Sequence, residues 1–293
     1  MKQVDGVSII EKALEKQGGL PPEPAAFEAA TDGPASEPAK PSPQVSKKPQ
    51  IIVNRERLQE RGMLAPDAAS GQLVEEYRMI KRPLLMNAFG EGAEVIPHAN
   101  LILVTSSLPG EGKTFTAVNL ALSIAAERDK TVLLVDADVI KPATSRLFDA
   151  HERPGLIDVL EREKPLADVL LRTDIPKLTL LPAGRQHSHA TELLASEEMQ
   201  RLAREISQRY PDRVVIFDSP PLLATTQASV LATHVGQVVL VVEAESTPQY
   251  IVKEAADMLN TCEVVGCVLN KTQQGFGLGY YAYYGYKYYN YGE

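Results

Sequence analysis

The sequence has little basic charge and few cysteines, and each shortage excludes a class of protein. A net charge of −8 argues against a general nucleic-acid binder, because such proteins need a basic surface to displace counterions from phosphates. We therefore expect no nucleic-acid partner. The two cysteines, Cys262 and Cys267, fit neither a zinc knuckle nor a CxxC redox pair. We expect both to be buried, reduced thiols, as suits a cytosolic protein.

Membrane signals are missing from the sequence as well. No stretch approaches the roughly 20 apolar residues that span a bilayer. The N-terminus also lacks the apolar core of a signal peptide. We therefore expect any connection to a membrane to come through a partner.

The composition divides the chain into four parts. Residues 1–17 carry apolar side chains at helical spacing, which predicts an amphipathic helix, either a frayed terminal helix or a docking peptide. Residues 18–50, rich in Pro, Ala and Glu, predict a disordered linker. Residues 51–274 predict one large globular domain, and residues 275–293 a flexible tyrosine-rich tail. A hydrophobic fraction of 44% is enough for that domain to build a core.

Four apolar runs alternate with helical stretches in the large domain. The runs are LILVTSS (101–107), VLLVDAD (132–138), VVIFDSP (214–220) and VVLVVEA (238–244), and the helical stretches include residues 115–128 and 192–209. Nearly continuous Val, Ile and Leu strands separated by helices indicate strands that are buried on both faces. The sequence therefore predicts an α/β domain, with a doubly wound, mostly parallel sheet that has helices on both faces.

A glycine-containing turn follows the first apolar run and precedes a helix. Gly110 and Gly112 allow the backbone N–H groups to approach a phosphate, and the helix N-terminus adds its positive end. Lys113 can reach the β- and γ-phosphates, and Thr114 can offer a hydroxyl to Mg²⁺. Ser107 stands where the G-x-x-x-x-G-K-[ST] pattern has its first glycine. A plain strand-turn-helix connection is the alternative.

Three aspartates end two of the apolar runs. Asp136 and Asp138 flank one residue and point the same way if that segment is extended, whereas Asp218 precedes a turn stiffened by two prolines. A lone aspartate at a strand end is usually a cap or a turn former. Three of them beside a phosphate loop would repel one another, and a hydrated Mg²⁺ on nucleotide phosphates relieves that repulsion. The sequence therefore predicts a site for a nucleotide and Mg²⁺.

The end of the chain is dense in tyrosine. Eight of the eleven tyrosines lie between positions 280 and 291: Tyr280, Tyr281, Tyr283, Tyr284, Tyr286, Tyr288, Tyr289 and Tyr291. No packing pattern explains this composition. One interpretation is a low-complexity segment for weak association.

These motifs together resemble the bacterial tyrosine kinases (BY-kinases), P-loop proteins of MinD/ParA-like architecture. The Walker A-like SSLPGEGKT, the Walker A′-like VLLVDAD, the Walker B-like VVIFDSPP and the tyrosine-rich end carry the resemblance, over about residues 70–293. The N-terminal helix, the linker and the DADVIKP variant look most like the exosortase-associated tyrosine autokinases of exopolysaccharide systems.

The resemblance implies a role for each motif residue. The triphosphate would bind to Leu108, Pro109, Gly110, Glu111, Gly112, Lys113 and Thr114; the metal site would comprise Thr114, Asp136, Asp138 and Asp218; and the catalytic residues would be Lys113, Asp136 and Asp138. Asp136 would lie near the γ-phosphate and the incoming phenol. Asn270 matches the position that reads the adenine edge in related ATPases, although a turn residue is the alternative. Ile140 stands where many members carry arginine, so an arginine contact at that position is in doubt.

The segment EEYRMIK resembles the oligomerisation motif of the family. Glu75, Arg78 and Lys81 match it, with lysine in place of the last arginine. Spacing by three puts these residues on one face of a helix, so a solvated salt-bridge stripe is the alternative.

The resemblance implies an ATP-dependent protein-tyrosine autokinase that regulates exopolysaccharide or capsule polymerisation and export. Its subunits would form a ring and phosphorylate each other's tails, because a glycine-punctuated tether can present phenols to a neighbouring active site. Expected partners are a separate transmembrane activator of the chain-length-determinant type and a cognate tyrosine phosphatase. The protein would be cytoplasmic and recruited to the membrane by its activator. The rival functions are a MinD/ParA-type ATPase that acts as a dimerising switch without tyrosine phosphorylation, and a non-enzymatic adaptor.

Overall fold

A computed structural model describes residues 50–66, 70–90 and 96–272. The predicted helix at 1–17, nearly all of the predicted linker at 18–50 and the tyrosine-rich tail at 275–293 lie outside the described residues. All of the predicted nucleotide-site residues and the three residues of the oligomerisation motif lie within them.

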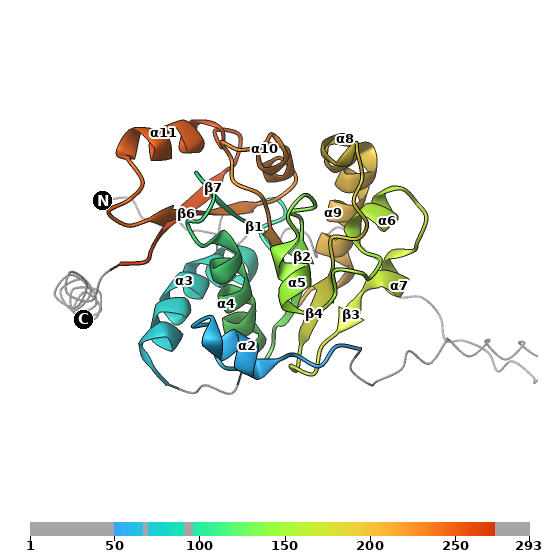
Figure 1. Cartoon of the computed structure of the whole chain (residues 1–293), viewed down its shortest axis with the longest axis horizontal. Helices are drawn as coiled ribbons and strands as arrows, with labels where there is room; N and C mark the ends of the chain where they lie inside the picture. The colour runs from blue at the N-terminus through green and yellow to red at the C-terminus, as the bar shows by residue number, and fades with distance from the viewer. Residues whose placement is uncertain (1–49, 67–69, 91–95, 273–293) are drawn as a thin grey trace, which may run out of the picture. The chain divides into compact units, whose positions relative to one another are not determined.

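A seven-stranded sheet forms the centre of the domain (Figure 1). Its strands are β1 (Leu101–Ser106), β2 (Thr131–Asp136), β3 (Leu171–Arg172), β4 (Leu178–Leu181), β5 (Arg213–Asp218), β6 (Gln237–Glu243) and β7 (Val264–Asn270). The spatial order is β3-β4-β2-β5-β1-β6-β7. Every neighbouring pair is parallel except β3 and β4 at one edge. The predicted mostly parallel sheet is confirmed.

Helices cover both faces of this sheet. They are α2 (Arg55–Glu60), α3 (Gln72–Phe89), α4 (Lys113–Ala125), α5 (Ala143–Leu147), α6 (Leu156–Leu160), α7 (Leu166–Val169), α8 (Ala190–Leu194), α9 (Glu197–Arg209), α10 (Gln227–Ala232) and α11 (Gln249–Asp257). Alternate residues of β1 enter opposite cores, because successive side chains of a strand point to opposite faces. Ile102 and Val104 pack with α2, α3 and α4, whereas Leu101 and Leu103 pack with α9, α10 and α11.

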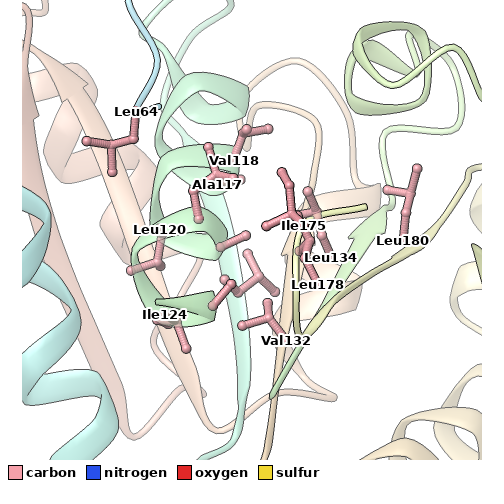
Figure 2. Packing of buried hydrophobic residues seen from close by; sticks show 14 of the residues in the cluster. Leu64, Ala117, Val118, Leu120, Ile124, Val132, Leu134, Ile175, Leu178 and Leu180 are labelled. Carbon is pink, nitrogen blue, oxygen red and sulfur yellow. The ribbon is translucent and has the colours of Figure 1, made fainter. Parts of the chain in front are cut away.

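Helix α4 lies in the middle of one core. Every residue from Thr116 to Ala125 is buried, because α4 packs on the sheet and is itself covered by α3. Figure 2 shows Leu120 and Ile124 on α4, with Val132 and Leu134 of β2 among the neighbouring side chains. This packing fixes the direction of α4, and therefore the position of its N-terminus at the end of β1.

The structure corrects two expectations. The helix predicted over 192–209 is two helices, since α8 ends at Leu194 and α9 begins at Glu197. Ser196 separates them because its hydroxyl oxygen caps α9 by accepting a bond from the Met199 N–H. The thiols are free, but Cys262 is only half-buried and Cys267 is exposed. Cys267 is exposed because it lies on β7, the strand at the edge of the sheet.

Among the helices in the part of the chain that the structure describes, none is both long and apolar enough to cross a membrane.

The central position of α4 predicts a large cost for truncating its core side chains. Leu120→Ala should lower the free energy of unfolding by about 2–5 kcal/mol, because Leu120 is fully buried and a cavity would remain. Urea denaturation measures this change. Met79→Ala on α3 is the control, since Met79 is 50% exposed and its truncation should cost less than about 1 kcal/mol. Equal losses for the two variants would contradict the packing.

Candidate active site

The predicted site residues meet at the carboxyl ends of β1, β2 and β5. These three strands are neighbours, and Asp136 lies directly opposite Asp218 in the β2–β5 register. The loop that follows β1 leads straight into α4 at Lys113. Open α/β sheets bind ligands at this end of their strands. The structure therefore brings the phosphate loop and the acids together.

The loop between β1 and α4 needs its two glycines. Gly110 has φ +93° and Gly112 has φ +100°, in a region of backbone conformation that other residues rarely adopt. A Cβ atom on Gly112 would also lie 2.0 Å from Nδ2 of Asn270. The glycines therefore satisfy both the turn geometry and the close approach of a neighbouring side chain.

Glu111 anchors this loop from inside. Its side chain is almost fully buried and accepts hydrogen bonds from the Leu108 N–H (2.6 Å) and the Thr247 hydroxyl (2.5 Å). The Glu243 N–H donates to the same carboxylate at 3.4 Å. The sequence placed Glu111 in the phosphate loop but did not predict this anchoring, because Thr247 lies far along the chain. The loop is thereby tied to the end of β6.

Asn270 completes the same attachment from β7. Its Nδ2 donates to the backbone carbonyl of Glu111 at 2.8 Å. Asn270 therefore lies beside the phosphate loop, where its side chain could also contact the base of a nucleotide bound to that loop. Its role as a reader of the adenine edge stays a prediction.

Lys113 and Asp138 form an ion pair inside the site. The Lys113 Nζ lies 3.1 Å from Oδ2 of Asp138, and both side chains are largely shielded from solvent. The other oxygen of Asp138 accepts a bond from the Lys141 N–H at 3.0 Å. A triphosphate bound to the loop would compete with Asp138 for the Lys113 ammonium.

Asp136 and Asp218 are fully buried, and each has one oxygen without a hydrogen-bond partner. Oδ2 of Asp136 accepts from the Ser145 N–H at 2.6 Å, and Oδ2 of Asp218 accepts from the Thr144 hydroxyl at 2.8 Å. Oδ1 of each aspartate has no partner in the described structure. Sequence reasoning missed Thr144 and Ser145, since no motif distinguishes the short helix α5 that carries them.

The surroundings of these two acids disfavour their charged forms. Burial, with a further contribution from the charge of Asp218, raises the pKa of Asp136 to about 8. Burial also raises the pKa of Asp218, although the charge of Lys113 and hydrogen bonds from Thr144 and Thr114 oppose this. The pair therefore needs a cation, or a proton, to be stable.

This donor set fits a hydrated divalent cation. Within the described ranges no group of three or more His, Cys, Asp or Glu side chains is arranged to hold a metal by itself. Mg²⁺ usually keeps several waters and takes only one or two carboxylates together with substrate phosphates. The buried oxygens of Asp136 and Asp218 that lack partners supply that number of ligands, and the half-buried Thr114 lies beside Asp218.

The turn after β5 closes the site on another side. The hydroxyl of Thr105 donates to the carbonyl of Pro220 at 2.9 Å, and the Leu222 N–H donates to the carbonyl of Ser106 at 2.8 Å. The predicted stiff turn is therefore bonded to the end of β1. Ser107, in the place of the first glycine of the motif, is buried and its hydroxyl has no partner in the described structure.

The three residues of the oligomerisation motif do not share one exposed face. Glu75 and Arg78 are exposed on α3 and form an ion pair with each other. Lys81 instead points inward, where its Nζ lies 2.6 Å from Glu127 and donates to the carbonyl of Ser123 at 2.8 Å. Lys81 therefore attaches α3 to the end of α4, so the three side chains do not form the solvated salt-bridge stripe that was the alternative to the motif. The role of the motif in oligomerisation stays a prediction.

Two other features of the sequence differ in whether the structure describes them. Ile140, which replaces an arginine of the family pattern, is 50% exposed just after the Asp138 turn. The eight tail tyrosines lie outside the described residues.

The close approach of Asn270 predicts that Gly112→Ala weakens nucleotide binding. The new Cβ would displace Asn270 and strain a backbone with φ +100°, so the affinity for a fluorescent ATP analogue should fall by roughly tenfold or more. Gly62→Ala is the matched control, because Gly62 also has positive φ but no atom lies within 4 Å of the added Cβ. Unchanged affinity in Gly112→Ala would count against this geometry.

The raised pKa values predict that stability falls as the pH rises. Because the folded pKa of Asp136 exceeds its ordinary value of 3.8, the folded chain retains a proton that the unfolded chain releases. The resulting stabilisation is complete below about pH 4. Between about pH 4 and about pH 8 the free energy of unfolding falls by up to about 1.4 kcal/mol per pH unit for each group.

Urea midpoints measured in EDTA across this pH range test the effect. Asp136→Asn should flatten the profile, whereas the exposed control Asp257→Asn should leave it unchanged. A flat profile for the unmodified chain would show that the acids are not buried as described.

Known proteins resemble this chain in sequence and in fold. An AAA domain model matches residues 99–273. The tyrosine-protein kinase YwqD of Bacillus subtilis (strain 168) is 32% identical over 232 residues, which cover 78% of this chain and 94% of YwqD. The putative tyrosine-protein kinase CapB of Staphylococcus aureus is 32% identical over 75% of this chain and 93% of CapB. The putative tyrosine-protein kinase EpsB of Ralstonia nicotianae is 34% identical, but the match covers only 26% of EpsB.

Solved structures agree with these matches. The kinase domain of VpsO is 30% identical, with a TM-score of 0.57, over 69% of this chain and 100% of that domain. The kinase domain of the Escherichia coli tyrosine kinase ETK has a TM-score of 0.62 over 78% of this chain and 94% of that domain; at 24% identity it shows the shared fold. With its phosphate loop and strand-end acids in place, the chain belongs to the bacterial tyrosine-protein kinases, and its enzyme class is protein-tyrosine kinase.

Proposed function

We propose that the protein is an ATP-dependent autokinase that phosphorylates its own C-terminal tyrosines in trans between subunits. The observation that carries the proposal is the buried pair Asp136 and Asp218, opposite each other beside Lys113 and the glycine turn. This arrangement suits a metal-bound triphosphate. The acceptors would be Tyr280, Tyr281, Tyr283, Tyr284, Tyr286, Tyr288, Tyr289 and Tyr291.

The loop and Lys113 would hold the nucleotide. Backbone N–H groups of the turn and the N-terminus of α4 would bind the phosphates. The Lys113 ammonium would move from Asp138 to the phosphate oxygens. Mg²⁺, held by Asp136, Asp218 and Thr114 with water, would neutralise charge on the phosphates. Asn270, bonded to Glu111, would place the base relative to the loop.

Asp136 is the proposed acid–base residue for the incoming tyrosine. Free phenolate at neutral pH costs about 4 kcal/mol, because a tyrosine titrates near pH 10. The transition state of phosphoryl transfer is loose, so alignment and charge stabilisation contribute more than full deprotonation. Asp136 is enclosed by α5 through the Ser145 N–H, so a phenol can reach it only when that helix shifts.

The wider setting of the enzyme follows from the family resemblance. We propose a ring-shaped homo-oligomer in which the exposed Glu75 and Arg78 of α3 contribute contacts. A separate transmembrane activator of the chain-length-determinant type would recruit the otherwise cytoplasmic kinase to the inner face of the membrane. A tyrosine phosphatase would reverse the modification, and the cycle would regulate exopolysaccharide polymerisation and export. This setting matches that of the exosortase-associated subgroup.

Incubation with ATP and Mg²⁺, followed by mass spectrometry of the C-terminal peptide, tests the kinase activity. The unmodified chain should acquire phosphate on several tail tyrosines in the presence of its activator. Lys113→Met should reduce this by roughly 100-fold or more, because the ammonium that stabilises the transferred phosphate is lost. A variant with all eight tail tyrosines changed to Phe should still hydrolyse ATP but should acquire no phosphate on its tail. If the chain of natural sequence acquires no phosphotyrosine at all, the MinD/ParA-type ATPase becomes the better interpretation.

A mixing experiment separates transfer between subunits from transfer within one chain. The Lys113→Met chain retains its tail but lacks activity, and the eight-fold Tyr→Phe chain retains activity but lacks acceptors. If transfer occurs in trans, the Lys113→Met tail becomes phosphorylated only after the two are mixed. No modification in the mixture, alongside efficient modification of the unmodified chain, would demonstrate transfer in cis.

A further inference from the structure

A basic cavity lies between α3 and the loop that follows α4, away from the active site. Its volume is about 510 Å³. Four cationic residues line it, and Glu127 is the single acidic residue among the described residues that do so; the cations are Arg78, Lys81, Arg82 and Lys130. On a chain with a net charge of −8, this excess of positive charge is a local exception. The basic cavity therefore suits an anionic ligand.

The charges of the basic cavity are only partly compensated. Glu127 pairs with Lys81, and Arg78 pairs with Glu75. Arg82 is exposed and forms no ion pair or hydrogen bond with another described residue. The Lys130 ammonium lies 3.8 Å from the centre of the Phe89 ring and has no acidic partner in the described ranges. Arg82 and Lys130 can therefore contribute uncompensated charge to a ligand.

The basic cavity also has an apolar wall. Leu85, Met86 and Phe89 line it, and Met86 is 60% exposed. A ligand that uses the whole cavity therefore combines an anionic group with an apolar or aromatic one. Phosphotyrosine has both features in one side chain, since its phosphate carries about −1.5 to −2 charges on an aromatic ring.

We propose that the basic cavity binds a phosphotyrosine of the C-terminal segment 280–291. This inference rests on the proposed function, which supplies the phosphorylated tail. The phosphate would interact with Arg82 and Lys130, and the ring would pack against Met86 and Phe89. A phosphotyrosine of the protein's own tail satisfies both the charge and the apolar wall, whereas a membrane surface would leave a concave apolar wall unfilled.

The basic cavity is distinct from the active site but within reach of the tail. Helix α4 begins at the phosphate loop and runs alongside α3 (Figure 1). Glu127 and Lys130, which line the cavity, follow the other end of α4. The 13 residues of α4 separate the two sites by about 20 Å at 1.5 Å per residue. Residues 273–293 can extend over about 70 Å at roughly 3.3–3.6 Å per residue. The tail can therefore reach the cavity.

A phosphotyrosine bound in the basic cavity would connect phosphorylation of the tail with the assembly of the subunits. Arg78 lines the cavity and also belongs to the exposed pair on α3 that we assign to subunit contacts. A bound phosphotyrosine would add negative charge next to Glu75 and draw Arg78 away from it. The product of the kinase would thereby compete with contacts between its subunits.

Fluorescence anisotropy with a synthetic peptide of residues 280–291, phosphorylated at Tyr286, tests this inference on the full-length, dephosphorylated chain. The phosphopeptide should bind at least about tenfold more tightly than the unmodified peptide, because the unmodified peptide lacks the dianion. Arg82→Glu and Lys130→Glu should each weaken binding by roughly tenfold. Phenyl phosphate should compete better than inorganic phosphate, because only the former can use the apolar wall.

Two matched variants locate the binding. Lys253→Glu reverses an exposed charge on α11 and should have little effect, whereas a loss equal to that of Arg82→Glu would indicate non-specific attraction and overturn the inference. Binding abolished by Lys113→Met but retained in Arg82→Glu would place the peptide in the active site and would also overturn it. So would Arg82-dependent binding to phosphatidylserine vesicles with no binding of the phosphopeptide. Because the peptide is synthetic, failure of autophosphorylation would not affect this measurement.

Discussion

The enforced closeness of two buried acidic side chains is the constraint around which the active site is organised. Asp136 and Asp218 end neighbouring strands in direct register, so the sheet itself forces them together. Two hydrogen bonds from α5 hold one oxygen of each, and the charge of Lys113 offsets part of the repulsion. The remaining oxygens are buried without partners. A divalent cation bound with the nucleotide, as proposed, would supply a partner for these oxygens.

A second set of contacts holds the phosphate loop. These contacts come from β6, β7 and the segment after β6, on the opposite side of β1 from the two acids. Glu111 connects the loop to Thr247 beyond β6, and Asn270 connects it to the end of β7. The two ends of a nucleotide would therefore be read by parts of the chain that are bonded to each other. If Asn270 contacts the base as predicted, this arrangement would fix the distance between phosphates and base without a separate domain.

The layer formed by α3 and α4 links the active site to the surface assigned to assembly. Helix α4 starts at the phosphate loop and ends where Lys81 of α3 pairs with Glu127. Because Lys81 is used within the chain, only Glu75 and Arg78 of the motif remain exposed for contacts with a neighbour. Arg78 also lines the basic cavity, so the proposed ligand would act on the same surface.

The sequence by itself determined the class of fold, the phosphate loop and the strand-end acids, because each of these depends on residues that are close together in the chain. Long Val, Ile and Leu runs mark strands buried on both faces, and Gly112, Lys113 and Thr114 are consecutive. Only the tertiary structure decided that Asp136 faces Asp218, that Thr144 and Ser145 bond to them, and that Lys81 turns inward. Thr144 and Asp218 are 74 residues apart, so strand register and helix packing alone bring them together. Local patterns encode the elements, whereas contacts between distant segments are set by how the buried faces fit.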